Sequence, residues 1–398
     1  MSTDATGGAD AGRASGPDRA VGPAAFAARP GFVGLDPVVE GGPVAAAHFG
    51  APVHEQRALL AGRAVADLSD RGVVTVTGPD RLSWLHSLTT QHLLGLAPGD
   101  SAETLLLDAS GRLEHAAHVV DDGETTWLVV EGVEAAPLAA WLDRMRFMLR
   151  VEVADRSADL AVVGAAGDVA LPVPVVAPAG VPVVWTDPWP GVVVGGHGYA
   201  PDEGHPGHER AWRETVVTRD DLALLAAGDL PVAGQLAVEA LRVEAWRPRA
   251  ATEVDEKTLP HELDWLRTAV HLAKGCYRGQ ETVAKVHNLG HPPRRLVMLH
   301  LDGSDAVLPS RGDAVVVAAP GDDARDARAV GAVTSVALHH ELGPVALAVV
   351  RRTTDEHAPL AVLAGDAVVA AAQQTIVPPG AGAAAAVPRL PRLGAVRR

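Results

Sequence analysis

Segments with a helix pattern and segments with a strand pattern alternate between residues 54 and 148, whereas only strand-like runs follow Arg294. Apolar residues that recur every three or four positions predict a helix, and alternation of apolar and polar residues predicts a strand. The mixed first part therefore predicts an α+β fold. The short runs after Arg294, which Gly, Asp and Pro separate, predict a small C-terminal β-barrel.

The pattern also predicts individual elements. Helices are predicted at residues 54–68, 81–94, 137–148 and 236–245. Strands are predicted at residues 72–78 and, separated by turns, three times within residues 103–132. The proline-rich stretch at residues 171–190 is predicted to form loops and edge strands.

Both ends of the chain are predicted to be disordered tails. Residues 1–30 and 378–398 are rich in Ala, Gly and Pro and carry few large apolar side chains. Such segments bury too little apolar surface to order themselves. We therefore expect the folded part to lie between the two tails.

Charge and hydropathy exclude several classes of protein. The chain has 34 Lys and Arg residues against 49 Asp and Glu residues, a formal net charge of −15, which is not typical of a sequence-independent nucleic-acid binder. The first residues lack the apolar core of a secretory signal, and prolines interrupt the least charged stretch, residues 169–185. We expect a cytoplasmic protein without a direct nucleic-acid or membrane partner.

Cys276 is the only cysteine among 398 residues, which excludes an intramolecular disulfide and a metal or cluster site built from several thiolates of this chain. Lys274 and Arg278 stand two residues away on either side, and nearby cations favour the thiolate form. Gly275 and Gly279 allow backbone conformations that other residues resist. The sequence therefore predicts a nucleophilic or ligating thiol, with a small buried cysteine as the alternative.

The residues that follow Cys276 favour the functional alternative. Tyr277, Gln280 and Glu281 are polar, whereas a core position would have apolar neighbours. We expect these three side chains to shape the site around the thiol.

A second candidate site is the stretch LRVEAWRPR at residues 241–249. If a helix ends here, Glu244 can present its carboxylate to a bidentate donor such as an aminopyrimidine edge. A solvated helix end with surface ion pairs explains the pattern equally well. The pair His339–His340 could bind a metal, but we expect it to face solvent beside a barrel turn, and no metal site is predicted.

The segment KGCYRGQE, residues 274–281, resembles the K-G-C-Y-x-G-Q-E signature of the YgfZ-type folate-binding proteins. These proteins are relatives of the glycine-cleavage T-protein and of a mitochondrial iron–sulfur maturation factor. Further similarity to the superfamily lies in VADLSDRGVVTVTGPDRLSWLHSLTT, in LRVEA and in AVGAVTSVALHHELGPVALAVV. The resemblance implies three lobes around a central funnel that holds tetrahydrofolate, with two α+β lobes at residues 31–290 and the barrel at residues 291–377.

The resemblance also implies roles for single residues. A glutamate in L-R-x-E-A contacts the pterin in the T-protein, and the matching residue is Glu244, with Arg242 and Trp246 beside it. The T-protein has glycine where this chain has Trp246. It also has paired aspartates for aminomethyl transfer where this chain offers Glu114 and His115, so glycine cleavage is not expected.

The function that the resemblance implies is a folate-binding accessory factor for synthesis or repair of iron–sulfur clusters in client enzymes, including tRNA-modifying ones. Tetrahydrofolate would be its cofactor and the client proteins its partners. Cys276 would contact a cluster transiently, because one thiolate cannot hold a cluster alone. Two alternatives are a folate-dependent one-carbon transferase of the aminomethyl type and a non-catalytic folate-binding scaffold.

Overall fold

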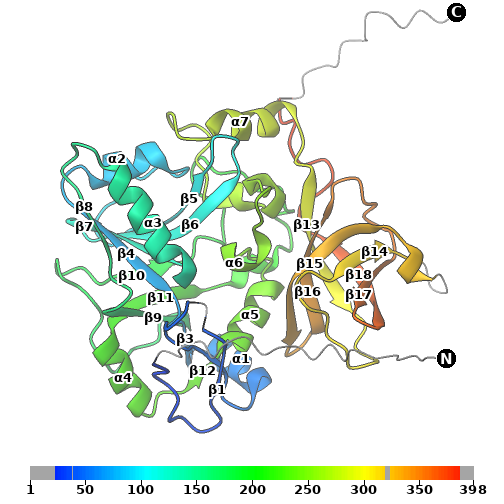
Figure 1. Ribbon diagram of the computed structural model, residues 1–398, viewed down its shortest axis with the longest axis horizontal. Coiled ribbons are helices and arrows are strands. Elements are labelled where there is room, and N and C mark those ends of the chain that lie inside the picture. Colours follow the sequence, from blue (N-terminus) through cyan, green and yellow to red (C-terminus); the bar gives the residue numbers. More distant parts are fainter. Residues whose placement is uncertain (1–22, 38, 319–322, 386–398) are drawn as a thin grey trace, which may run out of the picture.

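The computed structural model describes residues 23–37, 39–318 and 323–385, and Figure 1 shows two α+β lobes beside a β-barrel. The expected tails lie mostly outside the described residues. Residues 23–30 are described, however, and Phe26 is buried in an apolar cluster with Val163 and Leu225. Near the other end Ala381 is buried and the backbone N–H of Ala384 donates to His287. The expected boundaries at residues 30 and 378 therefore need correction, because apolar contacts order the adjoining residues.

The first lobe is built on an antiparallel sheet with the strand order β5-β6-β7-β4-β8. Its strands are β4 (Gly72–Thr77), β5 (Ser101–Leu107), β6 (Leu113–Asp121), β7 (Thr125–Val130) and β8 (Glu152–Asp155), and its helices are α2 (Arg81–Leu88) and α3 (Gly132–Met145). Apolar side chains from both helices form one core with the sheet. The predicted strands at residues 72–78 and 103–132 are confirmed. The helix predicted at residues 81–94 ends at Leu88, because Thr89 turns to an extended conformation.

The second lobe contains a sheet with the order β10-β11-β9-β3-β12. Its strands are β3 (Val65–Asp67), β9 (Leu160–Ala166), β10 (Val184–Thr186), β11 (Trp212–Thr218) and β12 (Val232–Ala233), accompanied by α1 (Pro52–Leu60), α4 (Arg219–Ala227) and the 3-10 helix η1 (Pro206–Glu209). A small pair, β1 (Val33–Gly34) and β2 (Ala46–His48), lies beside them. The single helix predicted at residues 54–68 is wrong in its second half, because Gly62 adopts a φ of 64° and the chain then enters β3. β10 is an edge strand, as predicted for the proline-rich stretch.

The C-terminal part is a closed barrel with the strand order β13-β16-β15-β14-β17-β18, which confirms the predicted barrel. Its strands are β13 (Arg294–Leu301), β14 (Ala314–Val317), β15 (Ala329–His339), β16 (Gly343–Arg351), β17 (Leu360–Ala364) and β18 (Ala367–Thr375), with the 3-10 helix η4 (Ala324–Asp326). Alternate strand residues such as Val297, Leu299 and Leu301 fill the interior of the barrel.

The segment between the second sheet and the barrel positions the candidate sites. It contains α5 (Gln235–Glu244), α6 (Ala250–Glu253), the 3-10 helices η2 (Pro260–Leu263) and η3 (Trp265–Arg267), and α7 (Gln280–Leu289). Val238 and Leu241 of α5 pack on the second sheet, while Ala240 and Val243 belong to a core that includes Leu347 of the barrel. α5 is therefore fixed on both faces, and Figure 1 shows it between the second lobe and the barrel.

Candidate functional site

Cys276 lies in the loop that leads into α7, and its side chain is exposed. The loop is held on both sides of the thiol. Before it, the backbone N–H of Lys274 donates to His271, and after it, Gln280 Nε2 donates to the carbonyl of Lys274 at 3.2 Å. The thiol is thus presented to solvent on a segment whose backbone is fixed.

Lys274 serves as an anchor for this loop. Its buried ammonium donates to the backbone carbonyls of His86, Thr89 and Gln91, which uses all three of its protons. These carbonyls lie in the last turn of α2 and just after it, where a cation also interacts favourably with the helix dipole. Burial lowers the pKa of Lys274 to about 8. Lys274 thus anchors the loop to the end of α2, and its expected effect on the thiolate stays a prediction.

Arg278 also has a partner other than the thiol. Its Nη1 lies 2.8 Å from Oε2 of Glu114 on β6, and both side chains are substantially exposed. The charge of Arg278 is therefore shared with Glu114, and its expected effect on the thiolate stays a prediction. His115, the neighbouring candidate, is half-buried with its Nδ1 3.7 Å from Glu134.

The other predicted residues of this loop divide into one buried and two more exposed side chains. Tyr277 is buried beneath the loop with the ammonium of Lys274 5.1 Å from its ring centroid, and burial raises the pKa of its hydroxyl. Glu281 is exposed in the first turn of α7, where a negative charge is favourable. Gln280 is partly buried and holds the loop as described above. Tyr277 therefore supports the loop from below.

The two glycines of the motif have different roles. Gly279 has a φ of 83°, and a Cβ atom there would meet the carbonyl oxygen of Asp108 at 2.6 Å. Gly111, at the turn between β5 and β6, lies against it, and its own Cβ would meet Thr282. Gly275 has no positive φ, and a Cβ there would meet nothing within 4 Å. Of the two motif glycines, Gly279 is therefore the one that the close approach of this loop to the β5–β6 turn requires.

The expected central funnel is filled by buried ion pairs. Oε1 of Glu131 lies 2.8 Å from Arg71 Nη1 and 2.7 Å from Arg249 Nε. Glu239 contacts Arg249 at 3.0 Å and Arg242 at 2.6 Å. Burial alone would raise the pKa of Glu131, but Arg249 and Arg71 outweigh it and lower that pKa to about 2. Both carboxylates therefore already form ion pairs with arginines.

The remaining space of this central cavity is about 50 Å³. Ligand pockets usually measure about 300 to 1,000 Å³. The side chains around the central cavity thus leave less free space than such pockets have, and folate binding in the central funnel stays a prediction. Arg242 does line this cavity, as its predicted role requires, but it binds Glu239, Glu253 and Ser335.

Glu244 lies on a different and larger cavity of about 660 Å³. Its carboxylate is half-buried, with Oε2 3.2 Å from Nε2 of His339. Nδ1 of His339 accepts from the backbone N–H groups of Glu341 and Leu342, so the neutral ring carries its proton on Nε2, toward Glu244. The His339 contact lowers the pKa of Glu244. The carboxylate is thus held ionised at the wall of a cavity of ligand size.

Trp246 lines neither of these two cavities. It is buried in the core, and its Nε1 donates to Sδ of Met298 at 3.2 Å. Its φ of 57° lies in the left-handed region that favours glycine, so packing holds this tryptophan in a strained conformation. Trp246 was expected among the folate-binding residues, and the structure places it in the core beside Met298.

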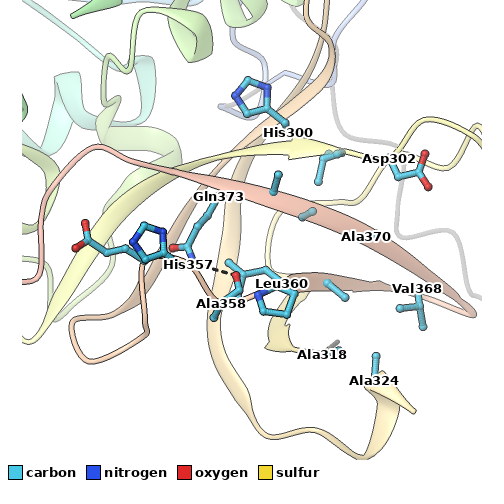
Figure 2. Close-up of a pocket in the computed structure, with 16 residues that line it drawn as sticks. His300, Asp302, Ala318, Ala324, His357, Ala358, Leu360, Val368, Ala370 and Gln373 are labelled. Atoms are coloured by element: carbon cyan, nitrogen blue, oxygen red, sulfur yellow. Dashed lines mark hydrogen bonds between the residues drawn. The ribbon is translucent and has the colours of Figure 1, made fainter. Parts of the chain in front are cut away.

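Figure 2 shows a further cavity, of about 760 Å³, on the barrel. Small side chains such as Ala370 line it, with His300 and His357 among its polar residues. None of the predicted site residues lies there. Within the described ranges no group of three or more His, Cys, Asp and Glu side chains is arranged to hold a metal ion.

One residue of these sites was missed by the sequence analysis, and another was placed wrongly. Glu239 is central to the ion-pair network, and its spacing of three residues from Arg242 on one helix was the available signal. His339 was expected to face solvent, but it is 3% exposed because its ring packs behind Glu244. Its partner lies 95 positions earlier in the chain, so local pattern gave no sign of the contact.

Comparisons with known proteins agree with this fold. Residues 23–173 match the family described as GCVT N-terminal domain. The chain superposes on aminomethyltransferase T of the glycine cleavage system from Bartonella henselae with a TM-score of 0.64 and 19% identity, over 87% of this chain and 94% of that one. The fold is therefore that of the T-protein.

Two of the sequence relatives are aminomethyltransferases as well. The chain is 27% identical to an aminomethyltransferase of Symbiobacterium thermophilum over 68% of this chain and 75% of the relative. It is 26% identical to an aminomethyltransferase of Nostoc sp. over 76% and 80%. A chloroplastic protein of Arabidopsis thaliana, described as a transferase, is 26% identical to this chain. The match covers 60% of this chain and 56% of that protein, so this chain spans little more than half of that relative. Together these findings show similarity in sequence to aminomethyltransferases and in fold to the T-protein.

No helix in the described part of the chain has the length and apolar character needed to cross a membrane.

Proposed function

We propose that the protein is a folate-binding accessory factor of the YgfZ type, which supports synthesis or repair of iron–sulfur clusters in client enzymes, including tRNA-modifying ones. The observation that carries this proposal is the presentation of Cys276. The only cysteine of the chain is exposed on a loop that Lys274 and Gly279 fix from either side. A soft sulfur ligand presented in this way is accessible to a cluster or a reactive sulfur group of a partner.

The cavity at Glu244 is the proposed site for tetrahydrofolate. Its volume of about 660 Å³ lies within the usual range for ligand pockets. The carboxylate of Glu244 suits the aminopyrimidine edge of a pterin, because it accepts two parallel hydrogen bonds. Leu60, half-exposed on the same cavity, offers an apolar surface for the ring. When bound, the reduced pterin supplies a carrier for one-carbon groups.

A one-carbon transferase of the aminomethyl type is the second candidate, favoured by the names of two relatives. Glu114 is exposed and paired with Arg278, and the carboxylates Glu131 and Glu239 of the central cavity are paired with arginines. A transferase needs an acid or base beside its substrate, and Glu244 or Glu209 on the proposed folate cavity would have to supply it. The accessory role differs in its need for the exposed thiol.

Ligand-dependent stability tests the folate part of this proposal. Saturating tetrahydrofolate should raise the melting temperature, because a ligand that binds only the folded state stabilises it by about 2.7 kcal/mol at a hundredfold excess over Kd. Glu244→Gln should abolish most of the rise, whereas Glu152→Gln, an exposed acid on β8, should keep it. No rise in the wild-type protein, or an equal rise in the Glu244 variant, would contradict the site.

A further inference from the structure

The chain forms an exposed apolar tip where α3 ends and turns toward β8. The apolar tip consists of Met145, Phe147, Met148 and Leu149, all of which are exposed. Phe147 is 91% exposed and Met148 is 88% exposed, whereas exposed large apolar side chains are more scattered elsewhere in the described chain. Because water solvates such a cluster poorly, contiguous exposed apolar side chains mark surfaces that another molecule covers.

The backbone of the apolar tip is fixed, although its side chains are exposed. The N–H of Leu149 donates to the carbonyl of Arg146 at 2.9 Å, and the N–H of Arg150 donates to Oδ2 of Asp80 at 2.9 Å. Phe147 has a φ of 49°, in a left-handed conformation that persists only where the surrounding contacts impose it. The apolar tip therefore has its shape before a partner binds, which lowers the entropic cost of docking.

Arginines flank the apolar tip, in a chain whose formal net charge is −15. Arg146 is paired with Asp143 at 3.1 Å, and Arg150 is paired with Asp80 at 2.7 Å. Arg144 is exposed, and no acid of the described chain lies within ion-pair distance of it. Aromatic, methionine and arginine side chains are enriched in protein interfaces. A complementary surface is therefore an apolar hollow with an acid opposite Arg144.

Helix α2 connects the apolar tip to the loop of Cys276. Asp80, which binds the tip, directly precedes α2, and Lys274 binds carbonyls at the other end of this helix. The helix has eight residues, a length of about 12 Å, and exposes Ser83 and Ser87 along it. A standard interface buries about 800 Å² on each partner, a patch roughly 30 Å across. One docked protein can therefore cover both the apolar tip and the thiol.

We propose that the apolar tip is the docking surface for the client enzyme. An apolar hollow of the client, with an acid opposite Arg144, receives Phe147 and Met148 and brings the client's cluster or reactive sulfur group to Cys276. This inference rests on the proposed accessory function. An anionic lipid surface or a second copy of this chain is disfavoured, because either would repel a chain of net charge −15, whereas an acid at the edge of a hollow acts locally.

The probe for this test is the purified cluster enzyme that loses most activity in cells that lack the protein. Its affinity for the full chain is measured by calorimetry. Phe147→Ser with Met148→Ser should weaken binding about tenfold or more, as truncation of central anchors does. Arg144→Glu should weaken it about threefold to tenfold, and less at high salt. Leu224→Ser and Arg63→Glu, at exposed positions of the second lobe, are the matched controls and should bind like the wild type.

Alkylation of Cys276 tests whether the docked client also covers the thiol. The bound enzyme should slow alkylation of the wild type, but it should not protect the double variant at the same concentration. Urea midpoints of the free variants should equal that of the wild type, because the changed side chains are exposed. A loss of affinity then reports on docking and not on folding.

Several results overturn the inference. No binding to the wild type, or equal affinity for the double variant, excludes the docking surface, and alkylation that the bound enzyme does not slow excludes its alignment with the thiol. Tip-dependent binding to vesicles of phosphatidylcholine and phosphatidylglycerol would assign the tip to a lipid surface. A tip-dependent dimer in sedimentation velocity would assign it to a second copy. If no cluster enzyme loses activity in cells without the protein, the proposed function itself fails, so the two failures are distinguishable.

Discussion

Arg278 and Glu114 join the loop of Cys276 to β6 through an ion pair, with Nη1 2.8 Å from Oε2. Both side chains are exposed by about two fifths, so water screens the attraction. Exposed ion pairs contribute about 0.2 to 1 kcal/mol. A double-mutant cycle with Arg278→Gln and Glu114→Gln in urea should therefore give a coupling below about 1 kcal/mol.

The alkylation rate of Cys276 should also change little in Arg278→Gln, because the guanidinium is engaged by Glu114. A large coupling energy in the cycle, or a pronounced drop in alkylation rate, would contradict this description of Arg278.

The two glycines beside Cys276 offer a matched comparison. Gly279→Ala should lower the free energy of unfolding by about 1 to 3 kcal/mol, because alanine is strained at a φ of 83° and its Cβ would overlap the Asp108 carbonyl. Gly275→Ala should be nearly neutral, since its φ is not positive and its surroundings are open. Urea denaturation of the two variants measures this. Equal losses would argue against the close approach of the loop to the β5–β6 turn.

Lys274 should matter for stability more than for the chemistry of the thiol. Lys274→Met leaves three carbonyls at the end of α2 without their donor, and an unsatisfied buried group costs about 1 to 3 kcal/mol. Lys285→Met, at an exposed position of α7, is the control and should cost little. If both variants unfold at the wild-type urea midpoint, the anchoring role is wrong.

The sequence predicted the strands of the first lobe and most of the barrel, because these depend on local periodicity. The strands from β4 to β7 and the barrel strands from β13 to β16 follow from alternation and turn residues, whereas most strands of the second lobe were not predicted. Helix ends were less accurate. α2 ends at Leu88 and not at residue 94. The carbonyl of the next residue, Thr89, accepts a hydrogen bond from Lys274, which lies 185 positions further along the chain. No local pattern reports such a contact.

For the candidate sites as well, local pattern indicated some features, whereas long-range contacts left no sign in the sequence. Exposure of Cys276 follows from its polar neighbours, and Glu244 was placed by its motif. The buried pairing of Glu131 with Arg249 could not be foreseen, because the two residues are 118 positions apart and their contact depends on the packing of two lobes. The burial of Trp246 was not foreseen either, because its core contact, Met298, lies on the barrel.

Asp264 should make stability depend on pH. Burial raises the pKa of this fully buried carboxyl to about 7, although the N–H groups of Tyr199 and Ala200 and the charge of Arg267 oppose the shift. Between its ordinary value near 3.8 and about 7, the folded state keeps a proton that the unfolded state has lost. Stability from this group therefore falls as pH rises through that window and is constant above it.

Asp264→Asn keeps the shape of the protonated group without titrating. Urea midpoints at pH 4.5 and 7.5 should therefore differ less in the variant than in the wild type. An unchanged difference would show that Asp264 does not carry this dependence.

The central claim, that Cys276 is the functional thiol, is tested most directly by complementation in cells that lack the protein. Cys276→Ser should leave the fold and folate binding nearly intact, because the side chain is exposed and Gly279 sets the loop. It should lower the activity of cluster-dependent enzymes, since an alcohol is neither a soft ligand nor a comparable nucleophile near neutral pH.

Glu114→Ala, an exposed position on β6, is the matched control, with cluster-enzyme activity and protein abundance measured together. The account predicts loss of that activity with Cys276→Ser at normal abundance and rescue with Glu114→Ala. Full rescue by Cys276→Ser at normal abundance would contradict it, and a selective loss with Glu114→Ala would favour one-carbon transfer instead.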